Sequence, residues 1–199
     1  MKNNTLDFYN NNSEQYYEST VKVDLSNIYS KFTDKLPKEG HILDLGCGSG
    51  RDSLYFKNAG YKITAVDGSK NLAALASKLI EQEVIVTRFE DINLTEKYDG
   101  IWACSSLLHL NEVELEKLLL KLEEALEDKG ILYMSFKYGN KEYIDDKGRY
   151  FNCYTEETMK ELINRYPSIE ISEVFKTIDV IPGREDVIWL NVICAKNRR

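Results

Sequence analysis

Three glycines at alternate positions, Gly46, Gly48 and Gly50, directly follow a short apolar run, His41–Leu45. The run is typical of a buried strand, and a helix is expected next, over Arg51–Asn58. Glycine lets the backbone adopt positive φ and approach a ligand closely. A helix N-terminus presents free N–H groups. The segment therefore predicts a strand–turn–helix unit that can bind a ligand, although a tight turn without a ligand would have the same pattern.

Acidic residues recur at the ends of the neighbouring predicted strands. Asp67 ends the second strand, the pair Glu90-Asp91 follows the third, over residues 84–88, and Tyr98-Asp99 precedes the fourth. A carboxylate at the end of the second strand can accept hydrogen bonds from both hydroxyls of a ribose. The combination is much more specific than the glycines alone and favours a nucleoside-containing ligand.

Two other nucleotide-binding motifs do not fit. A dinucleotide-binding GxGxxG motif would need glycine at position 51, where the chain has Arg51. A long charged side chain would crowd the helix–strand contact that the third glycine permits. The chain also has no Walker-type GxxxxGK[ST] segment.

Strands and helices alternate along the chain, which favours an α/β fold with a mainly parallel sheet. Further helices are expected over residues 13–36, 71–80, 111–130 and 155–165. Further strands are expected over residues 62–66, 101–104, 131–136, 169–175 and 187–195. Because only a loop separates the last two strands, at least one of them should run antiparallel to the others.

The helix from Asn111 has the clearest limits. Asn111 can cap it, with Glu114 three residues later as in a capping box. Gly130 is expected to end it as the C′ glycine.

This motif set resembles that of the class I S-adenosylmethionine-dependent methyltransferases. The resemblance is carried by Asp44-Leu45-Gly46-Cys47-Gly48-Ser49-Gly50, then Asp67, Glu90-Asp91 and Tyr98-Asp99. It covers about residues 41–136, and the two-strand return extends it to the C-terminus. Three further segments resemble the tellurite-resistance branch and the small bacterial methyltransferases named after it, namely Gly50-Arg51-Asp52-Ser53, Ser135-Phe136-Lys137-Tyr138-Gly139 and Trp189-Leu190-Asn191-Val192.

The resemblance implies a Rossmann-like doubly wound sheet of seven strands with an antiparallel last strand. It implies a single domain over residues 1–199, with a helical lid at 1–36, a cofactor-binding core at 41–136 and a substrate-side region at 137–199. The implied cofactor is S-adenosyl-L-methionine, which leaves as S-adenosyl-L-homocysteine.

By the same resemblance, Gly46, Cys47 and Gly48 would line the methionine part of the cofactor, and Asp67 would hold the ribose. Asp91 would accept from the adenine amino group. The complete set of cofactor-binding residues expected is Asp44, Gly46, Cys47, Gly48, Gly50, Arg51, Asp67, Gly68, Ser69, Asp91, Ile92 and Cys104.

The methyl acceptor should lie beyond the carboxyl end of the fourth strand. Ser105 and His109 follow that strand, and His109 is the predicted catalytic residue, as a general base or as a group that orients the acceptor. A histidine that only positions the helix at Asn111 is the alternative. Cys104 is expected to pack rather than to act as a nucleophile.

Two further groups are candidates for the acceptor site. The tyrosines Tyr9, Tyr16 and Tyr17 can form a lid, since aromatic faces attract a sulfonium, or they can simply pack a flanking helix. The basic and aromatic residues Lys137, Arg149, Arg184 and Trp189 suit an anionic or aromatic acceptor, or else are solvated loop residues.

Composition limits the partners. The formal net charge is -7, which argues against a dedicated nucleic-acid-binding protein. The four cysteines form no CxxC pair, so no metal site is indicated, and the chain has neither a membrane-length apolar stretch nor a secretory signal. A cytoplasmic protein is expected, and its oligomeric state is not indicated.

The sequence thus predicts an enzyme that transfers a methyl group by in-line displacement to a small-molecule acceptor. A methyltransferase that acts on tRNA or protein, and a cofactor-binding protein without turnover, are the alternatives.

Overall fold

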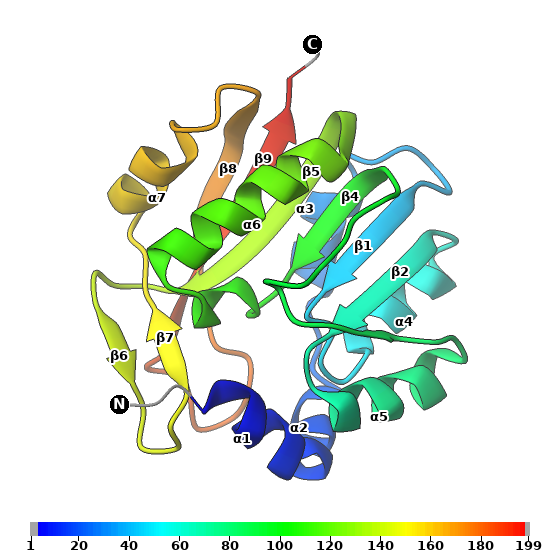
Figure 1. The fold of residues 1–199 in the computed structure, drawn as a ribbon, viewed down its shortest axis with the longest axis vertical. Coiled ribbons are helices and arrows are strands. Elements are labelled where there is room, and N and C mark those ends of the chain that lie inside the picture. Colours follow the sequence, from blue (N-terminus) through cyan, green and yellow to red (C-terminus); the bar gives the residue numbers. More distant parts are fainter. Residues whose placement is uncertain (1–3, 198–199) are drawn as a thin grey trace.

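The computed structural model describes residues 4–197 of the 199-residue chain. Its centre is a seven-stranded sheet with the order β3-β2-β1-β4-β5-β9-β8 (Figure 1). The strands are β1 (His41–Leu45), β2 (Lys62–Asp67), β3 (Ile85–Val86), β4 (Tyr98–Ala103), β5 (Leu126–Lys137), β8 (Ile169–Ile178) and β9 (Ile188–Lys196). Only β9 runs antiparallel to its neighbours, β5 and β8. The predicted sheet, with its reversed last strand, is confirmed.

Helices cover both faces of the sheet. The helices are α1 (Thr5–Asn11), α2 (Ser13–Thr20), α3 (Ser26–Thr33), α4 (Arg51–Asn58), α5 (Lys70–Ile80), α6 (Glu112–Ala125), α7 (Glu156–Ile163) and the short 3-10 helix η1 (Leu107–His109). α6 and α7 bury their apolar sides in one core cluster, and α3, α4 and α5 bury theirs in the other. Within the described residues, no helix is long and apolar enough to cross a membrane.

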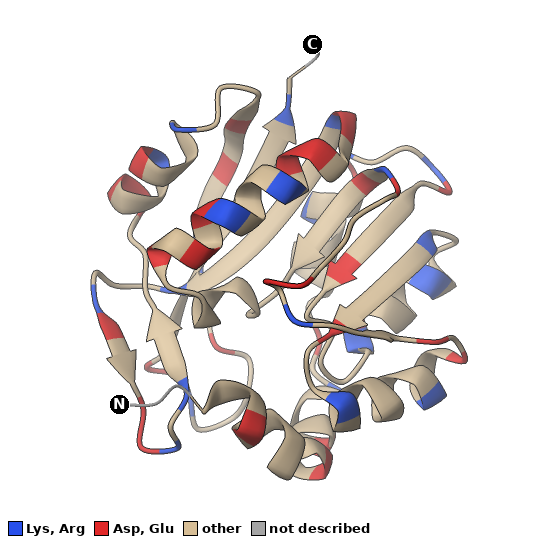
Figure 2. Cartoon of the chain, in the orientation of Figure 1, with Lys and Arg blue, Asp and Glu red and all other residues tan. Residues whose placement is uncertain are grey.

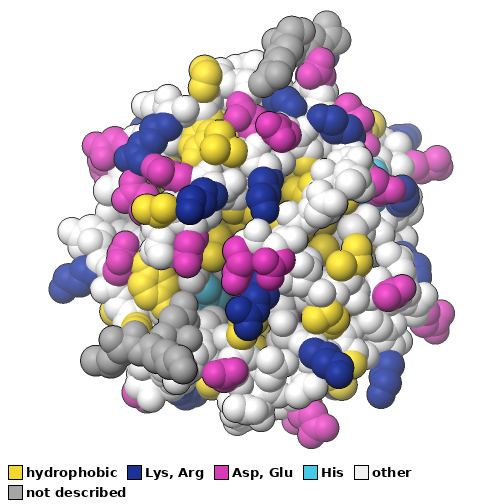
Figure 3. Space-filling view, viewed as in Figure 1, with side chains coloured by type: hydrophobic (Ala, Val, Ile, Leu, Met, Phe, Trp, Pro, Cys, Tyr) yellow, Lys and Arg dark blue, Asp and Glu magenta, His cyan; other side chains and the backbone are white. Residues whose placement is uncertain are grey.

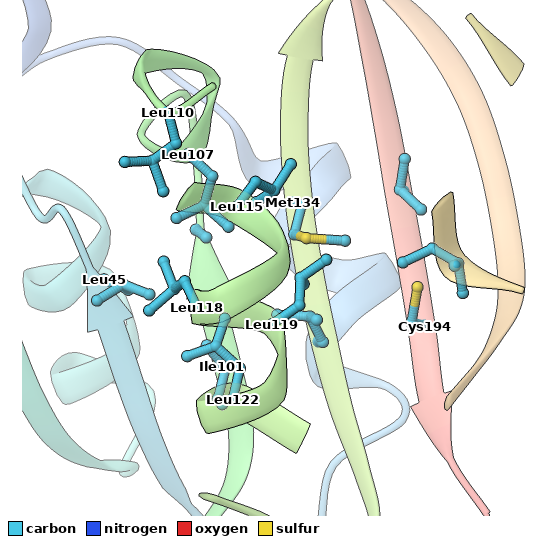
Figure 4. Close-up of a cluster of buried hydrophobic side chains, with 14 of the residues drawn as sticks. Leu45, Ile101, Leu107, Leu110, Leu115, Leu118, Leu119, Leu122, Met134 and Cys194 are labelled. Atoms are coloured by element: carbon cyan, nitrogen blue, oxygen red, sulfur yellow. The ribbon is translucent and has the colours of Figure 1, made fainter. Parts of the chain in front are cut away.

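Successive side chains of a central strand point to opposite faces of the sheet, so they belong alternately to the two core clusters. In β5, Leu132 and Met134 face α6, while Tyr133 faces the opposite cluster. Figure 4 shows the leucines of α6, among them Leu115 and Leu119, packed against this side of the sheet. Figure 2 shows that charged residues occur mainly on helices, loops and strand ends. The centre of the sheet is therefore mainly apolar, and most charged residues lie around it.

The N-terminal helix prediction was wrong in its limits. One helix was expected over residues 13–36, but the chain forms α2 and α3 with a turn between them, preceded by the unpredicted α1. The turn has a local cause, because the Asp24 carboxylate accepts a hydrogen bond from the backbone N–H of Ser26 (2.8 Å) at the start of α3.

The prediction for the end of α6 was also wrong. Asn111 and Glu114 form the expected capping box, but the helix ends at Ala125, and Gly130 lies within β5. Nζ of Lys196 donates to the carbonyl oxygens of Glu123 (2.6 Å) and Leu126 (2.7 Å). A distant lysine thus caps the helix, so no C′ glycine is needed.

Two short strands, β6 (Glu142–Ile144) and β7 (Tyr150–Asn152), form an antiparallel pair outside the main sheet. The sequence did not predict them. They lie beside α1 at the end of the sheet where the central parallel strands finish (Figure 1). They will be called the β6–β7 hairpin.

Candidate active site

The glycine turn follows β1 and leaves no room for side chains. Gly46 and Gly48 have φ of 81° and 55°. A Cβ on Gly46 would lie 2.5 Å from the Cβ of Ser106, and one on Gly48 would lie 3.3 Å from the ring of Tyr16. Both positions therefore require glycine, for backbone conformation and for close approach.

Asp67, at the end of β2, fixes this turn. One carboxylate oxygen accepts from the backbone N–H of Gly48 (2.8 Å), and the other accepts from the N–H of Ser69 (2.7 Å). Burial raises the pKa of the Asp67 carboxyl, and the two N–H groups act in the opposite direction. The carboxylate thus connects two turns while its remaining lone pairs can accept from a ligand.

Two cavities meet above the strand ends. The smaller, about 290 Å³, is lined by Asp67, Gly68 and residues 87–90, and the larger is about 710 Å³. Both are lined by Tyr9, Tyr16, Gly46, Gly48, Ser105 and His109. The larger one is also lined by Cys47, Arg51, Cys104, Lys137, Arg149, Arg184 and Trp189. Most of the predicted site residues therefore lie around one connected space.

The floor of the larger cavity contains polar side chains from β5 and β9. The Tyr133 hydroxyl donates to the side-chain oxygen of Asn191 (2.8 Å), and Ser135 Oγ accepts from the backbone N–H of Ser105 (2.8 Å). Sequence reasoning missed these residues. Polar side chains within otherwise apolar strands were the signal that could have found them.

α1 and α2 line both cavities, and these two helices will be called the lid. Tyr9 and Tyr16 point into the site from this lid, with ring centroids 5.1 Å apart. Asn10 holds the lid against the start of α5, where its side-chain oxygen accepts from the Ser69 hydroxyl (2.8 Å). On the other side, the Thr5 hydroxyl accepts from the backbone N–H of Tyr150 in the β6–β7 hairpin (3.0 Å). α1 is therefore hydrogen-bonded to the rest of the fold near both of its ends.

His109 lies where the lid, the sheet and the β6–β7 hairpin meet. Its Nδ1 is 2.6 Å from the backbone oxygen of Tyr150, and its Nε2 is 2.9 Å from the Tyr9 hydroxyl. Because a carbonyl oxygen can only accept, Nδ1 carries the proton and Nε2 accepts from Tyr9. Burial, together with the charges of Arg149 and Lys137, lowers the pKa of His109 to about 4, although the hydrogen bond to Tyr150 acts in the opposite direction. His109 is neutral near pH 7, with both nitrogens occupied.

Arg51 lies on the wall of the larger cavity in a buried ion pair. Its Nε is 2.6 Å from Oδ1 of Asp52, which also accepts from the Tyr29 hydroxyl (2.5 Å), while Oδ2 of Asp52 accepts from Trp102 Nε1 (2.8 Å). The arginine and these donors keep the pKa of Asp52 below its usual range despite burial. This cluster connects α3, α4 and β4 behind the glycine turn.

The predicted basic residues differ in their partners. Arg149 makes two hydrogen bonds to one oxygen of Asp145 (2.9 and 2.7 Å) and lies over the rings of Phe8 and Phe151. Arg184 is 4.0 Å from Asp179 at the opposite rim, where Trp189 Nε1 donates to the same carboxylate (3.1 Å).

Several predicted residues lie outside both cavity linings. Asp44 is buried and accepts from the Ser53 hydroxyl (2.5 Å), Asp91 is exposed, and Ile92 is buried in the core. Gly50, Ser69 and Tyr17 also line neither cavity. Their assigned roles stay predictions.

Comparison with known proteins identifies the family. The model of the family described as "Tellurite resistance protein TehB" matches residues 8–162, most of the chain. The chain belongs to the TehB family. This family of S-adenosylmethionine-dependent methyltransferases includes the probable methyltransferase TehB of Haemophilus influenzae, which is 32% identical over 127 residues, 60% of this chain and 43% of that protein. The match to this TehB therefore spans less than half of the relative's length.

Other relatives match over more of their length. An uncharacterized methyltransferase of Staphylococcus carnosus is 25% identical over 146 residues, 72% of this chain and 68% of that protein. Among solved structures, the TehB-like methyltransferase of Corynebacterium glutamicum has a TM-score of 0.72 at 21% identity, covering 94% of this chain and 99% of that one. The 1,6-didemethyltoxoflavin-N1-methyltransferase of Burkholderia thailandensis has a TM-score of 0.74 at 19% identity, covering 97% of this chain and 85% of that one. These structures share the fold of the TehB-family chain.

The residues present fit the cofactor that the family uses. Gly46 and Gly48 present backbone without side chains to both cavities, so a ligand there can lie close to the turn. The Asp67 carboxylate lines the smaller cavity with acceptor capacity left for ribose hydroxyls. The positively charged group of the cofactor would meet the aromatic rings of Tyr9 and Tyr16.

Proposed function

We propose that this TehB-family chain transfers the methyl group of S-adenosylmethionine to a small-molecule acceptor bound in the larger cavity. The observation that carries the proposal is the junction of two cavities at Tyr9, Gly46, Ser105 and His109. The nucleoside would occupy the smaller cavity, beside Asp67 and Gly68. The acceptor would approach the junction from the larger one.

The size and covering of the larger cavity support a small acceptor. Its volume of about 710 Å³ is within the usual range for small-molecule sites, about 300–1,000 Å³. The lid and the β6–β7 hairpin are hydrogen-bonded to each other across the site, which limits entry of a macromolecule. On the face in Figure 3, basic and acidic side chains are interspersed, unlike the basic stripe of an RNA-binding surface.

The cofactor supplies an activated methyl group, so the protein's main tasks are to align the acceptor and exclude water. Good alignment is worth about 7–11 kcal/mol. Tyr9 and Tyr16 cover the junction, and the Ser105–Ser135 hydrogen bond fixes the end of β4. These contacts hold the walls of the reaction space in place.

We assign His109 a positioning role rather than that of a general base. Its pKa of about 4 makes it a weak base, and its Nε2 lone pair already accepts from Tyr9. The acceptor's nucleophile should therefore arrive unprotonated, as a thiolate, a carboxylate, a weakly basic amine or an ionised acidic hydroxyl does.

The test is transfer of tritium from methyl-labelled S-adenosylmethionine to a bacterial extract. Ultrafiltration divides the extract into small-molecule and macromolecular fractions before the enzyme is added. We expect label in the small-molecule fraction, and much less with Asp67→Ala as the matched enzyme control. Label only in protein or RNA would contradict the proposal and favour the macromolecular alternative. Cofactor binding without transfer to either fraction would favour a non-catalytic binding protein.

A further inference from the structure

Lys137 is the last residue of β5, and its side chain lines the larger cavity but not the smaller one. Its ammonium lies 3.9 Å from the centroid of the Phe151 ring and donates to the Tyr143 hydroxyl (2.7 Å). The ring and the phenol hold the ammonium in place without neutralising it. An ammonium has three donors, so two stay available to a ligand.

The other cations on this cavity wall differ from Lys137. Arg51, Arg149 and Arg184 each have a carboxylate within 4.0 Å. Lys147 is exposed, and its ammonium is 5.8 Å from the centroid of the Phe8 ring. Over residues 4–197, no carboxylate forms an ion pair with Lys137, which is only partly exposed. Because no carboxylate among these residues neutralises this ammonium, a bound anion can form a charge-assisted hydrogen bond with it.

Lys137 lies near His109, because the Phe151 ring that its ammonium contacts also packs against the His109 ring, with centroids 5.0 Å apart. It lies close enough to His109, at the junction of the cavities, to help lower the pKa of that imidazole. The charge of Arg149 also lowers the pKa of His109. A negatively charged group near Lys137 would thus be held on the acceptor side, a short distance from the place of methyl transfer.

We propose that the acceptor is an organic anion whose carboxylate, or another negatively charged group, binds the ammonium of Lys137. The inference rests on the proposed function and names the class of acceptor for the same site. An inorganic oxyanion shares the charge but would fill little of about 710 Å³, since a water molecule occupies about 30 Å³. The remaining walls include the apolar side chains of Phe8, Ile28 and Trp189, which suit the carbon skeleton of an organic acceptor.

The experiment first separates candidate acceptors by their charge and then measures methyl transfer to each pool. The small-molecule fraction of a bacterial extract is passed over an anion-exchange resin, and bound and unbound pools are incubated separately with the enzyme and methyl-labelled S-adenosylmethionine. A third reaction contains tellurite as the sole acceptor. We expect label mainly in the pool that bound the resin. Label mainly in the unbound pool, or transfer to tellurite alone, would overturn the inference and leave methyl transfer intact. No transfer in any reaction would instead remove the proposed function.

Variants then test Lys137 itself on the anionic pool. Lys137→Met keeps the aliphatic packing and should lower kcat/KM by about tenfold or more, mainly through KM, because a charge-assisted hydrogen bond is lost. Lys137→Arg should retain most of the activity. Lys141→Met, a nearby exposed lysine outside both cavities, is the matched control and should behave as wild type. Binding of S-adenosylhomocysteine should be unchanged in all three. Wild-type kinetics in Lys137→Met would refute the assignment.

Discussion

The Tyr9 hydroxyl donates a hydrogen bond to His109 Nε2 at 2.9 Å, although the two residues are 100 positions apart. The contact joins the lid to the segment after β4. Tyr9→Phe removes it while it keeps the ring, so the lid should open more readily. We expect S-adenosylhomocysteine to dissociate about fivefold faster, which corresponds to a hydrogen bond of about 1 kcal/mol. Stopped-flow displacement measures this rate.

Tyr17→Phe provides the control for that experiment, because Tyr17 belongs to the same lid but lines neither cavity. It should leave the dissociation rate unchanged. Equal rates for both variants and the wild type would show that the Tyr9–His109 contact does not hold the lid.

The environment of His109 also predicts a dependence of stability on pH. Its pKa is lowered from the usual 6.5 to about 4, mainly by burial. Unfolding releases the imidazole to its ordinary pKa, so between these values the unfolded state binds more protons. Acid therefore destabilises the fold through His109 as the pH falls from about 6.5 to about 4, and this contribution is absent above that window.

His109→Gln isolates the effect. The unfolding free energy of the wild type should decrease relative to that of the variant as the pH is lowered through this window, as measured by urea titration. The chain has two histidines, so NMR titration of both imidazoles, with the variant for assignment, reads the pKa of His109 directly. A value near 6.5 would rule out the buried, neutral imidazole described here.

Local signals made part of this fold predictable. β1 and α4 have the limits expected from the sequence, because an apolar run, a glycine turn and a helix start follow one another directly. Asp67 was singled out by its place at the end of the second predicted strand, and the structure has it as the last residue of β2. Its contact with Gly48 is visible only in the structure, and its ribose-binding role stays a prediction.

Contacts between distant segments could not be predicted in this way. The end of α6 depends on Lys196, which lies 70 positions beyond Leu126. The β6–β7 hairpin is stabilised partly by Thr5, from the other end of the chain. His109 was singled out by its place after β4, but its two partners come from the lid and the hairpin. Its protonation state therefore required the structure.

Asp67 should contribute to both cofactor binding and order in the glycine turn. Asp67→Ala removes the acceptor for the N–H groups of Gly48 and Ser69, together with the proposed ribose contact. We expect affinity for S-adenosylhomocysteine to fall about ten- to hundredfold, measured by isothermal titration calorimetry. Asp34→Ala, at an exposed position after α3, should leave affinity unaltered. Wild-type affinity in Asp67→Ala would exclude Asp67 from the cofactor site.

Gly46 and Gly60 provide a paired test of why the turn needs glycine. Both have positive φ, 81° and 92°, so alanine at either position carries similar backbone strain. They differ in surroundings, because a Cβ on Gly46 would lie 2.5 Å from that of Ser106, whereas one on Gly60 would meet nothing within 4 Å. Gly46→Ala should therefore be less stable than Gly60→Ala by about 1–3 kcal/mol, the usual cost of overpacking.

Urea unfolding of the two variants measures this difference, and calorimetry with S-adenosylhomocysteine measures its functional consequence. Gly46→Ala should bind the cofactor product weakly, because Ser106 and the end of β1 must move apart to admit the methyl group. Gly60→Ala should bind as wild type does, since Gly60 lies far from both cavity linings in the turn after α4. If both variants lost the same stability and bound equally well, backbone conformation alone would explain the glycine, and the close approach at Ser106 would have no role in shaping the site.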